Sequence, residues 1–214
     1  MTETTLDALF MGAIRHLWPG KPPSAIAKTP VRAARVQVTG LLGDIQADLR
    51  VHGGPAKAVH VYPSQHYGWW ASQLGPNARF TPGGFGENIS QSAWTERDVC
   101  IGDVWRVGTA VLQVSQGRQP CWKLGAHVGD DRMADLVRTS LRTGWYMRVI
   151  EEGEIGIGDT IQRIDRPQPD VSVARVARAI FDKRTAPGEC AALACVPELD
   201  DAWAAILGRR AAIA

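Results

Sequence analysis

The chain has 214 residues, of which 45% are hydrophobic and 21% charged, a composition ordinary for a soluble globular protein, and its length suits one large domain with a small appendage or two modest domains. Its net charge of +2 gives no argument for nucleic acid or a membrane as a partner. No apolar run approaches the roughly 20 residues that span a bilayer. The first residues contain Glu3 and Asp7 and lack the pattern of a signal peptide, so we expect a cytoplasmic protein.

Short β-branched or alternating segments predominate between residue 10 and about residue 165. Glycine- and proline-rich turns separate them, for example at 53–55 and 81–84. Many short strands with such turns predict a mainly β domain that closes, or nearly closes, into a barrel. The strand candidates are 31–38, 58–62, 104–107, 110–114, 146–150 and 160–164.

Two helices are predicted at the periphery of this barrel. Ser64 is a suitable N-cap for a helix over 65–74, which places Tyr67, Trp70 and Leu74 at helical spacing. A second helical stripe follows, and Gly144 is expected to end it. Its apolar and small residues are Met133, Leu136, Val137, Ser140 and Leu141.

The composition changes at 166–170, where two prolines indicate a linker. Beyond it, Val173 begins a helical apolar pattern, and Pro187 and Pro197 are expected to open two further short helices. We therefore predict two parts, a barrel domain over 1–166 and a three-helix module over 167–214. DNA binding by this module is a weak alternative, because it lacks a basic recognition face.

Cys121 lies on a turn, 115–124, that follows the strand ending near Val114. Arg118 and Lys123 lie within three residues of it. Nearby cations favour the thiolate, which is the form that attacks electrophiles and binds soft metals. The turn therefore predicts a reactive or metal-ligating cysteine. The other three cysteines form no CxxC pair and are expected to be free thiols that fill the core: Cys100, Cys190 and Cys195.

Two glycine-containing loops carry polar residues of the kind found at binding sites. In the first, His52 precedes Gly53-Gly54-Pro55 and lies between Arg50 and Lys57. In the second, Gly83 to Gly86 precede Glu87, a candidate base, and Asn88, a candidate donor. Glycines allow the backbone to approach a ligand closely, but each loop is equally compatible with a purely structural turn.

The segment 20–28 supplies a third candidate for ligand binding. Lys21, Ser24 and Lys28 could hold an anion, although the segment lacks the spacing of a phosphate-binding P-loop. Singly, such residues are usually solvated. If the fold gathers them with the basic residues of the other loops, they form a positive rim around Cys121 that suits a phosphate-bearing ligand. Those other residues are Arg50, Lys57, Arg118 and Lys123.

These runs together resemble the MOSC family, named for the C-terminal domain of molybdenum cofactor sulfurases. The matching motifs are the His-Gly-Gly-Pro run at 52–55, the Phe-Gly-Glu-Asn run at 85–88, and Ser115-Gln116 followed by Pro120-Cys121. Segment 20–28 and the helical tail narrow the resemblance to the YiiM-like branch. The order of all four motifs carries more weight than any of them alone.

The resemblance implies a β-barrel that binds molybdenum cofactor, with Cys121 as the protein ligand of molybdenum. It also implies reduction of N-hydroxylated compounds such as hydroxylaminopurines, with His52 or Glu87 delivering protons and a separate flavin or iron–sulfur reductase supplying electrons. Pyridoxal phosphate binding is another property associated with the family. The residues expected to contact the cofactor are Lys21, Ser24, Lys28, Arg50, Lys57, Asn88, Ser115, Gln116, Arg118 and Lys123.

One departure from the pattern and two alternatives complete the expectations. Relative to the branch, His60 is displaced by one position, which on a strand reverses its face, so we place it outside the site. The first alternative is a sulfur carrier with a persulfide on Cys121, and the second is a non-catalytic carrier or store of the cofactor. No nucleic acid or membrane partner is expected, and both a monomer and a homodimer are compatible with the sequence.

Overall fold

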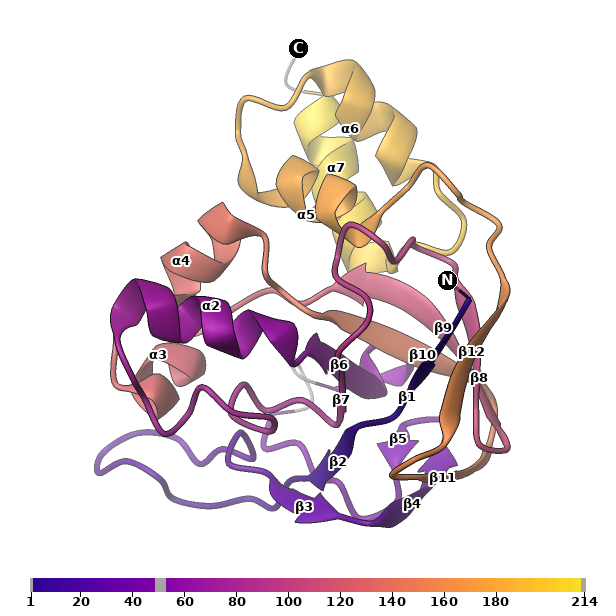
Figure 1. The fold of residues 1–214 in the computed structure, drawn as a ribbon. Coiled ribbons are helices and arrows are strands. Elements are labelled where there is room, and N and C mark those ends of the chain that lie inside the picture. Colours follow the sequence, from indigo (N-terminus) through magenta and orange to yellow (C-terminus); the bar gives the residue numbers. More distant parts are fainter. Residues whose placement is uncertain (1, 49–52, 213–214) are drawn as a thin grey trace.

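A computed structural model describes residues 2–48 and 53–212 of the chain. A nine-stranded sheet curls into a half-barrel, in the order β1-β12-β8-β9-β10-β6-β7-β2-β3 (Figure 1). All neighbours pair antiparallel except β6 and β7, which are parallel. The strands are β1 (Glu3–Thr5), β2 (Ala8–Met11), β3 (Thr29–Val31), β6 (Val59–Pro63), β7 (Ile89–Gln91), β8 (Val104–Val107), β9 (Ala110–Gly117), β10 (Trp145–Glu151) and β12 (Thr160–Asp165).

A second sheet of three strands, β11-β4-β5, covers one end of the half-barrel. Its strands are β4 (Ala33–Gln37), β5 (Gly40–Leu41) and β11 (Gly153–Gly156). The mainly β architecture expected from the sequence is therefore confirmed, with the barrel curled but divided between two sheets. Alternation explains the strands: along β4, Ala34 and Val36 are buried while Ala33 and Arg35 are exposed.

The core of the barrel contains three tryptophans. Trp105 packs against Trp94 and Trp145, with ring centroids 5.1 Å and 5.8 Å apart. Trp105 and Trp145 are at most 1% exposed, and burial of rings of this size supplies much of the hydrophobic stabilisation.

A single-turn 3-10 helix, η1 (Pro55–Lys57), precedes β6, and three α-helices then cover the outside of the half-barrel (Figure 1). They are α2 (Gln65–Leu74), α3 (Trp122–Val128) and α4 (Met133–Ser140). Their apolar side chains share a second core around Tyr62 and Phe85. The helix predicted over 65–74 is confirmed as α2. The predicted end of α4 at Gly144 is wrong, because Leu141 ends it with a left-handed backbone, φ 59°.

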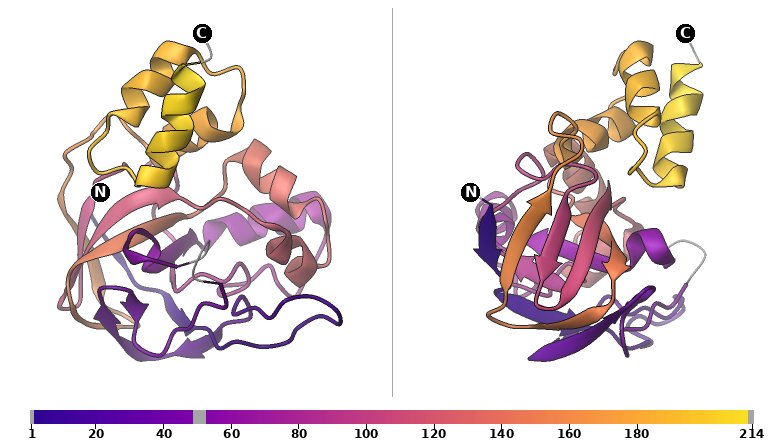
Figure 2. Two further views of the ribbon diagram at one scale, coloured as in Figure 1. Left: turned by 180° about the vertical axis from the view of Figure 1, so that it is seen from behind. Right: turned by 90° about the vertical axis from the view of Figure 1, so that its right-hand side faces the viewer.

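The C-terminal helices stand together at the top of the molecule (Figure 2). They are α5 (Val173–Phe181), α6 (Pro187–Ala194) and α7 (Asp201–Ala211). Val176, Leu193 and Trp203 belong to the same core as the barrel, so the module packs directly on the sheet. Pro197 does not open the last helix. That helix, α7, begins after Asp200, whose carboxylate accepts hydrogen bonds from the backbone N–H groups of Ala202 and Trp203.

The cysteines differ from expectation at one position. Cys100 and Cys190 are buried, in agreement with their prediction as core residues. Cys195 is exposed, because it follows the last turn of α6 and its side chain faces away from the core. The expectation that it fills the core is therefore wrong.

Candidate functional site at Cys121

Cys121 is the last residue of the short turn between β9 and α3. Its backbone is extended, φ −127° and ψ 171°, and its side chain is half-buried. The residue lines a pocket with about 610 Å³ of empty space, part of which is open to solvent. A half-buried sulfur in a pocket is accessible to a ligand, unlike the buried sulfurs of Cys100 and Cys190.

The pocket brings together seven of the residues predicted from separate loops. Besides Cys121, these are Ser24, Lys28, Lys57, Asn88, Arg118 and Lys123. They come from segment 20–28, from η1 before β6, from the loop before β7 and from the turn between β9 and α3. Four of the six basic residues predicted to converge around Cys121 therefore line its pocket, namely Lys28, Lys57, Arg118 and Lys123.

Lys28 is not available as a simple anion-binding cation, because it forms an ion pair with Asp44. Its Nζ lies 2.9 Å and 2.8 Å from the two carboxylate oxygens, and both side chains are nearly inaccessible. Burial lowers the pKa of Lys28, and the charge of Asp44 opposes that shift. Asp44, which also lines the pocket, is absent from the sequence prediction.

Arg118 is a buried cation in the pocket, only 8% exposed. Its backbone N–H donates to the carbonyl of Gly144 at 3.2 Å, and its side chain hydrogen-bonds Tyr146. Among the described residues no carboxylate forms an ion pair with Arg118. An arginine held in this way retains capacity to bind an anionic ligand.

His60 lines the pocket, so its exclusion from the site is wrong. The argument from strand alternation fails because β6 is a central strand buried on both faces, so neither face points to solvent. The His60 ring lies 5.0 Å from the ring of Tyr146, the residue that pairs with His60 on the neighbouring strand β10. Burial, helped by Arg118 and Lys28, lowers the pKa of His60 well below its usual value, so the ring is neutral at pH 7.

Tyr146 is a second aromatic residue of the pocket that the sequence did not single out. Burial raises the pKa of its phenol, while the charge and hydrogen bond of Arg118 act in the opposite direction. The hydroxyl is therefore protonated at neutral pH and can donate a hydrogen bond. Its position in an alternating strand gave no signal, because many strand tyrosines serve only in packing.

Glu87 does not face the pocket. It is fully buried, and its carboxylate accepts the Tyr67 hydroxyl at 2.6 Å and the N–H groups of Gly83 and Phe85 at 2.6 Å and 3.1 Å. Burial raises the pKa of Glu87, and these hydrogen bonds oppose the shift. Because its oxygens are occupied by the loop around it, the candidate general base is instead a structural residue of that loop.

Three other predicted residues are not among those that line the pocket. The Ser115 hydroxyl is buried within reach of the carbonyl oxygens of Ala56 and Tyr146, at 2.5 Å and 3.0 Å, and Gln116 is buried next to it. Lys21 is exposed, with its Nζ 5.6 Å from the centre of the Trp122 ring. The remaining two predicted residues, Arg50 and His52, lie outside the described residues.

The donor set determines what kind of metal centre the pocket could hold. Among residues 2–48 and 53–212, no three His, Cys, Asp or Glu side chains come together as a metal-binding group. A metal at Cys121 would need most of its ligands from a cofactor. One soft sulfur beside Lys57, Arg118 and Lys123 fits a group that carries its own metal ligands together with an anionic moiety.

A curled β half-barrel with a cysteine turn of this kind defines the class of MOSC domains, and the model of that family, "MOSC domain", matches residues 48–162. The protein is 39% identical to "Protein YiiM" of Escherichia coli over 171 residues, which cover 79% of this chain and 75% of that protein. The chain belongs to the MOSC domain family and, within it, to the YiiM-like proteins.

Two further relatives extend the comparison. The crystal structure of YiiM from Geobacillus stearothermophilus superposes with a TM-score of 0.82 at 29% identity, covering 98% of this chain and 99% of that one. A protein named "Reductase" from Gibberella moniliformis is 40% identical over 144 residues, 66% of this chain. The matched segment forms only 26% of that reductase. In the described part of this chain, no helix combines the length and apolar character needed to cross a bilayer.

Proposed function

We propose that this protein binds the molybdenum cofactor in the Cys121 pocket and reduces N-hydroxylated compounds. The observation that carries the proposal is the convergence of Cys121 with Lys57, Arg118 and Lys123 in one pocket. The cysteine sulfur would ligate molybdenum, and the cations would bind the anionic groups of the pterin phosphate. When bound, the cofactor would supply the two-electron chemistry that removes the hydroxyl oxygen as water.

The reaction R–NHOH + 2 e⁻ + 2 H⁺ → R–NH₂ + H₂O sets the tasks of the protein residues. The Tyr146 hydroxyl, kept protonated by its raised pKa, can donate a hydrogen bond to the oxygen of the N–O bond. Neutral His60 lines the pocket with its ring 5.0 Å from that of Tyr146, so it can shape the space in which the substrate would lie. These two residues are our candidates for substrate positioning, and His52 stays a predicted proton donor.

The electrons would come from a separate protein. The relative named "Reductase" contains a segment similar to this chain as 26% of its length, so most of that protein has no counterpart here. This supports a division in which the MOSC domain holds the substrate and another part or partner, such as a flavin or iron–sulfur protein, provides electrons.

Expression in a host that makes the cofactor tests the proposal. Wild type should carry about one molybdenum and one pterin per chain and should reduce 6-hydroxylaminopurine with dithionite-reduced methyl viologen. Cys121→Ala should lose the metal and the activity, while Cys195→Ser, which changes an exposed cysteine outside the pocket, should retain both. A metal-free wild type from such a host, or an active Cys121→Ala variant, would contradict it.

Sulfur transfer is the second candidate, because the half-buried Cys121 is accessible to a sulfur donor. It predicts metal-free protein from which cyanide releases one sulfur, lost in Cys121→Ala. A cofactor carrier would instead hold molybdenum and pterin without turnover. The same preparations therefore separate all three functions.

A further inference from the structure

A groove on another side of the molecule concentrates arginines. It consists of three adjoining hollows, and every pair of hollows has at least one lining residue in common. The first and third hollows share Arg97 and Ala174, the first and second share Arg178, and the second and third share Leu141. It lies between α4, α5 and the loop that follows β7. We define the arginine groove by Arg97, Arg138, Arg142, Arg175, Arg178 and Arg184.

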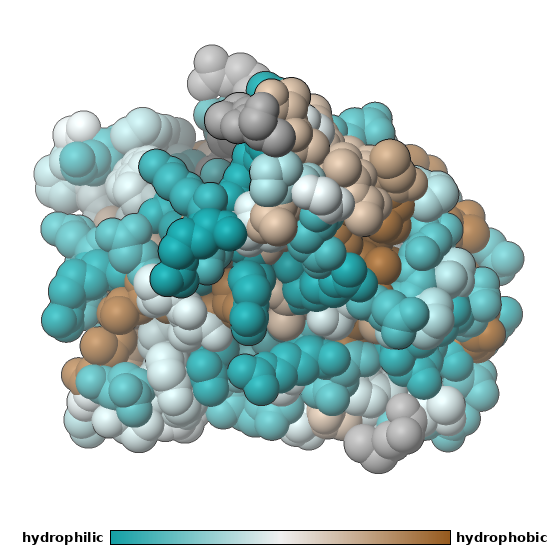
Figure 3. Space-filling model, turned by 90° about the horizontal axis from the view of Figure 1, so that it is seen from above, coloured by the Kyte–Doolittle hydropathy of each residue, from teal (hydrophilic) through white to brown (hydrophobic). Residues whose placement is uncertain are grey.

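The arginine groove carries an excess of positive charge. Its six arginines outnumber by two the three lining carboxylates and Asp135, which pairs with Arg138 at 2.7 Å, so this one groove carries as much excess positive charge as the +2 of the whole chain. Arg97 and Arg178 are exposed, and within the described ranges neither forms an ion pair. Seen from above, strongly hydrophilic side chains gather in the middle of this face, beside a hydrophobic patch (Figure 3).

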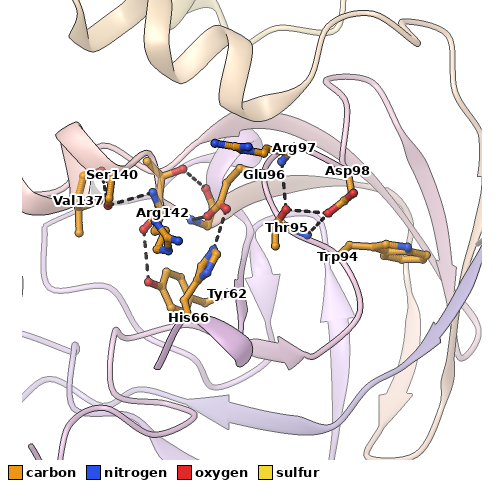
Figure 4. Close-up of polar contacts among 12 residues, drawn as sticks. Tyr62, His66, Trp94, Thr95, Glu96, Arg97, Asp98, Val137, Ser140 and Arg142 are labelled. Carbon is orange, nitrogen blue, oxygen red and sulfur yellow. Dashed lines mark hydrogen bonds and ion pairs between the residues drawn. The ribbon is translucent and has the colours of Figure 1, made fainter. Parts of the chain in front are cut away.

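The three carboxylates are already engaged. Asp182 pairs with Arg184 at 3.0 Å, and Glu189 pairs with Arg175 at 2.7 Å. Glu96, shown in Figure 4, accepts from Gly144 N–H at 2.6 Å and contacts His66 Nε2 at 2.8 Å. These bonds leave Arg97 and Arg178 as the cations most available to an incoming anion.

One hollow of the groove contains an unfilled donor. Arg142 stacks on Trp69, with the guanidinium carbon 3.8 Å from the ring centre. Its Nε is buried, with no hydrogen-bond partner among the residues that the structure describes. The Arg142 side chain that carries this donor lines the same hollow as the exposed Arg97, and two guanidinium groups lining one hollow suit it to a carboxylate.

The groove is coupled structurally to the cysteine turn. Arg138 lines it and donates from Nη2 to the carbonyl of Pro120, 3.3 Å away, and Pro120 directly precedes Cys121. Gly144 provides a second connection, since its N–H binds Glu96 and its carbonyl accepts from Arg118. A partner seated in the groove would therefore contact a side chain that is hydrogen-bonded to the turn carrying Cys121.

We propose that the arginine groove docks an acidic electron-donor protein, with one of its carboxylates entering the hollow beside Arg142. This inference rests on the proposed function, which requires two electrons from a donor for each N–O bond reduced. Isolated acidic side chains fit a groove whose cations alternate with engaged carboxylates and with the apolar Leu141 and Phe181. A continuous phosphate backbone fits less well, because the engaged carboxylates would repel it.

Binding by the cofactor-free protein tests the groove separately from catalysis. The probe is an oxidised acidic [2Fe–2S] ferredoxin, titrated calorimetrically at two salt concentrations. Wild type should bind it, and the affinity should fall as salt rises. The double variant Arg97→Glu/Arg178→Glu should weaken binding at least tenfold. The matched control Arg32→Glu/Arg35→Glu reverses two exposed arginines at β4 and should stay within about twofold.

Equal weakening by both double variants, or no weakening by the groove variant, would overturn the docking site. So would a duplex DNA probe that binds wild type more tightly than the ferredoxin and is lost in the groove variant, because the groove would then be a nucleic-acid site.

Turnover by the loaded protein separates this inference from the proposed function. Methyl viologen is small and needs no docking surface. The turnover rate with methyl viologen as electron donor should therefore be similar in wild type and in the groove variant. Turnover with reduced ferredoxin should fall at least tenfold in that variant alone. Absence of turnover with methyl viologen in wild type would contradict the proposed function, whereas an equal fall with both donors would contradict only the docking site.

Discussion

Asn88 and His60 are joined by two reciprocal hydrogen bonds. The Asn88 side-chain Oδ1 accepts the His60 backbone N–H at 3.0 Å, and the Asn88 backbone N–H donates to the His60 carbonyl at 2.8 Å. The same side chain donates from Nδ2 to Asp44 at 2.9 Å. Asn88 therefore fixes two walls of the pocket, the strand that carries His60 and the Lys28–Asp44 pair.

Replacement of Asn88 by Ala should lower the free energy of unfolding by about 2–4 kcal/mol, because buried donors and acceptors lose their partners. Urea denaturation measures this through its midpoint. Asn77→Ala is the matched control, since Asn77 is only part-buried and its amide binds the carbonyl of Val128. A loss for Asn88→Ala no larger than for Asn77→Ala would contradict the role assigned to Asn88.

The two members of the Lys28–Asp44 pair should contribute unequally to the free energy of unfolding. Asp44→Asn leaves a buried lysine without its counterion and should cost about 3–5 kcal/mol. Lys28→Met should cost less, because Asp44 keeps the N–H of Gly12 and the amide of Asn88 as donors. Chemical denaturation of both variants and the double variant gives the coupling free energy.

Stability should also depend on pH through Lys28. Its folded-state pKa lies below 10.5, so between that lowered pKa and 10.5 the unfolded chain binds more protons. The Lys28 contribution therefore favours folding increasingly as pH rises through this window. Lys28→Met should remove that contribution, and an unchanged pH slope in the variant would argue against the burial of the lysine.

Glu87→Gln distinguishes a structural residue from a catalytic base. The amide nitrogen of Gln cannot accept hydrogen bonds, so contacts to Tyr67, Gly83 or Phe85 are lost and the free energy of unfolding should fall by about 2–3 kcal/mol. At a temperature where the variant is folded, its pH–rate profile should match that of wild type. Loss of one limb of that profile at full folding would restore Glu87 as the base.

His127 should make the protein less stable in mild acid. Burial, with smaller contributions from Arg79 and Arg118, lowers the pKa of His127 from 6.5 to about 4. Between these values the unfolded chain binds the proton and the folded chain does not, so stability falls as pH drops from 6.5 to 4. Allowing for partial exposure, the loss is about 1–2 kcal/mol.

The measurement is the free energy of unfolding of wild type and His127→Gln at several pH values. The difference between the two curves isolates this side chain from the carboxylates that titrate in the same range. We expect the free energy of unfolding of wild type to fall relative to that of the variant as pH drops from 6.5 to 4, so that the variant shows the shallower slope in this range. Parallel curves would show that His127 keeps an ordinary pKa in the folded protein.

Much of the pocket could be predicted because its residues belong to recognisable local runs. Lys57, Arg118, Cys121 and Lys123 lie in loops whose glycines and prolines mark them as turns at strand ends, and such loops meet at one end of a barrel. The family resemblance supplied their order. The helix over 65–74 and strand β8 were likewise evident from local periodicity.

His60, Asp44 and Glu87 show where local pattern is insufficient. Alternation assigns a side chain to a face only if one face is solvated, and β6 is buried on both. Asp44 is a single carboxylate between Gly43 and Ile45 with no motif around it, and its contacts with Lys28 and Asn88 become visible only in the folded structure. Glu87 resembles a base in a glycine-rich loop until the loop folds its own N–H groups around it.

The sequence by itself determined the strand-rich class, the helical tail and the position of Cys121 on a turn after a strand, because these depend on composition and spacing along the chain. The tertiary structure decided which charges remain available in the pocket. Lys28 is neutralised by Asp44, whereas Arg118 keeps its charge beside Tyr146. Pairing between residues distant in sequence depends on how the strands meet in space, and burial then sets the strength of each interaction.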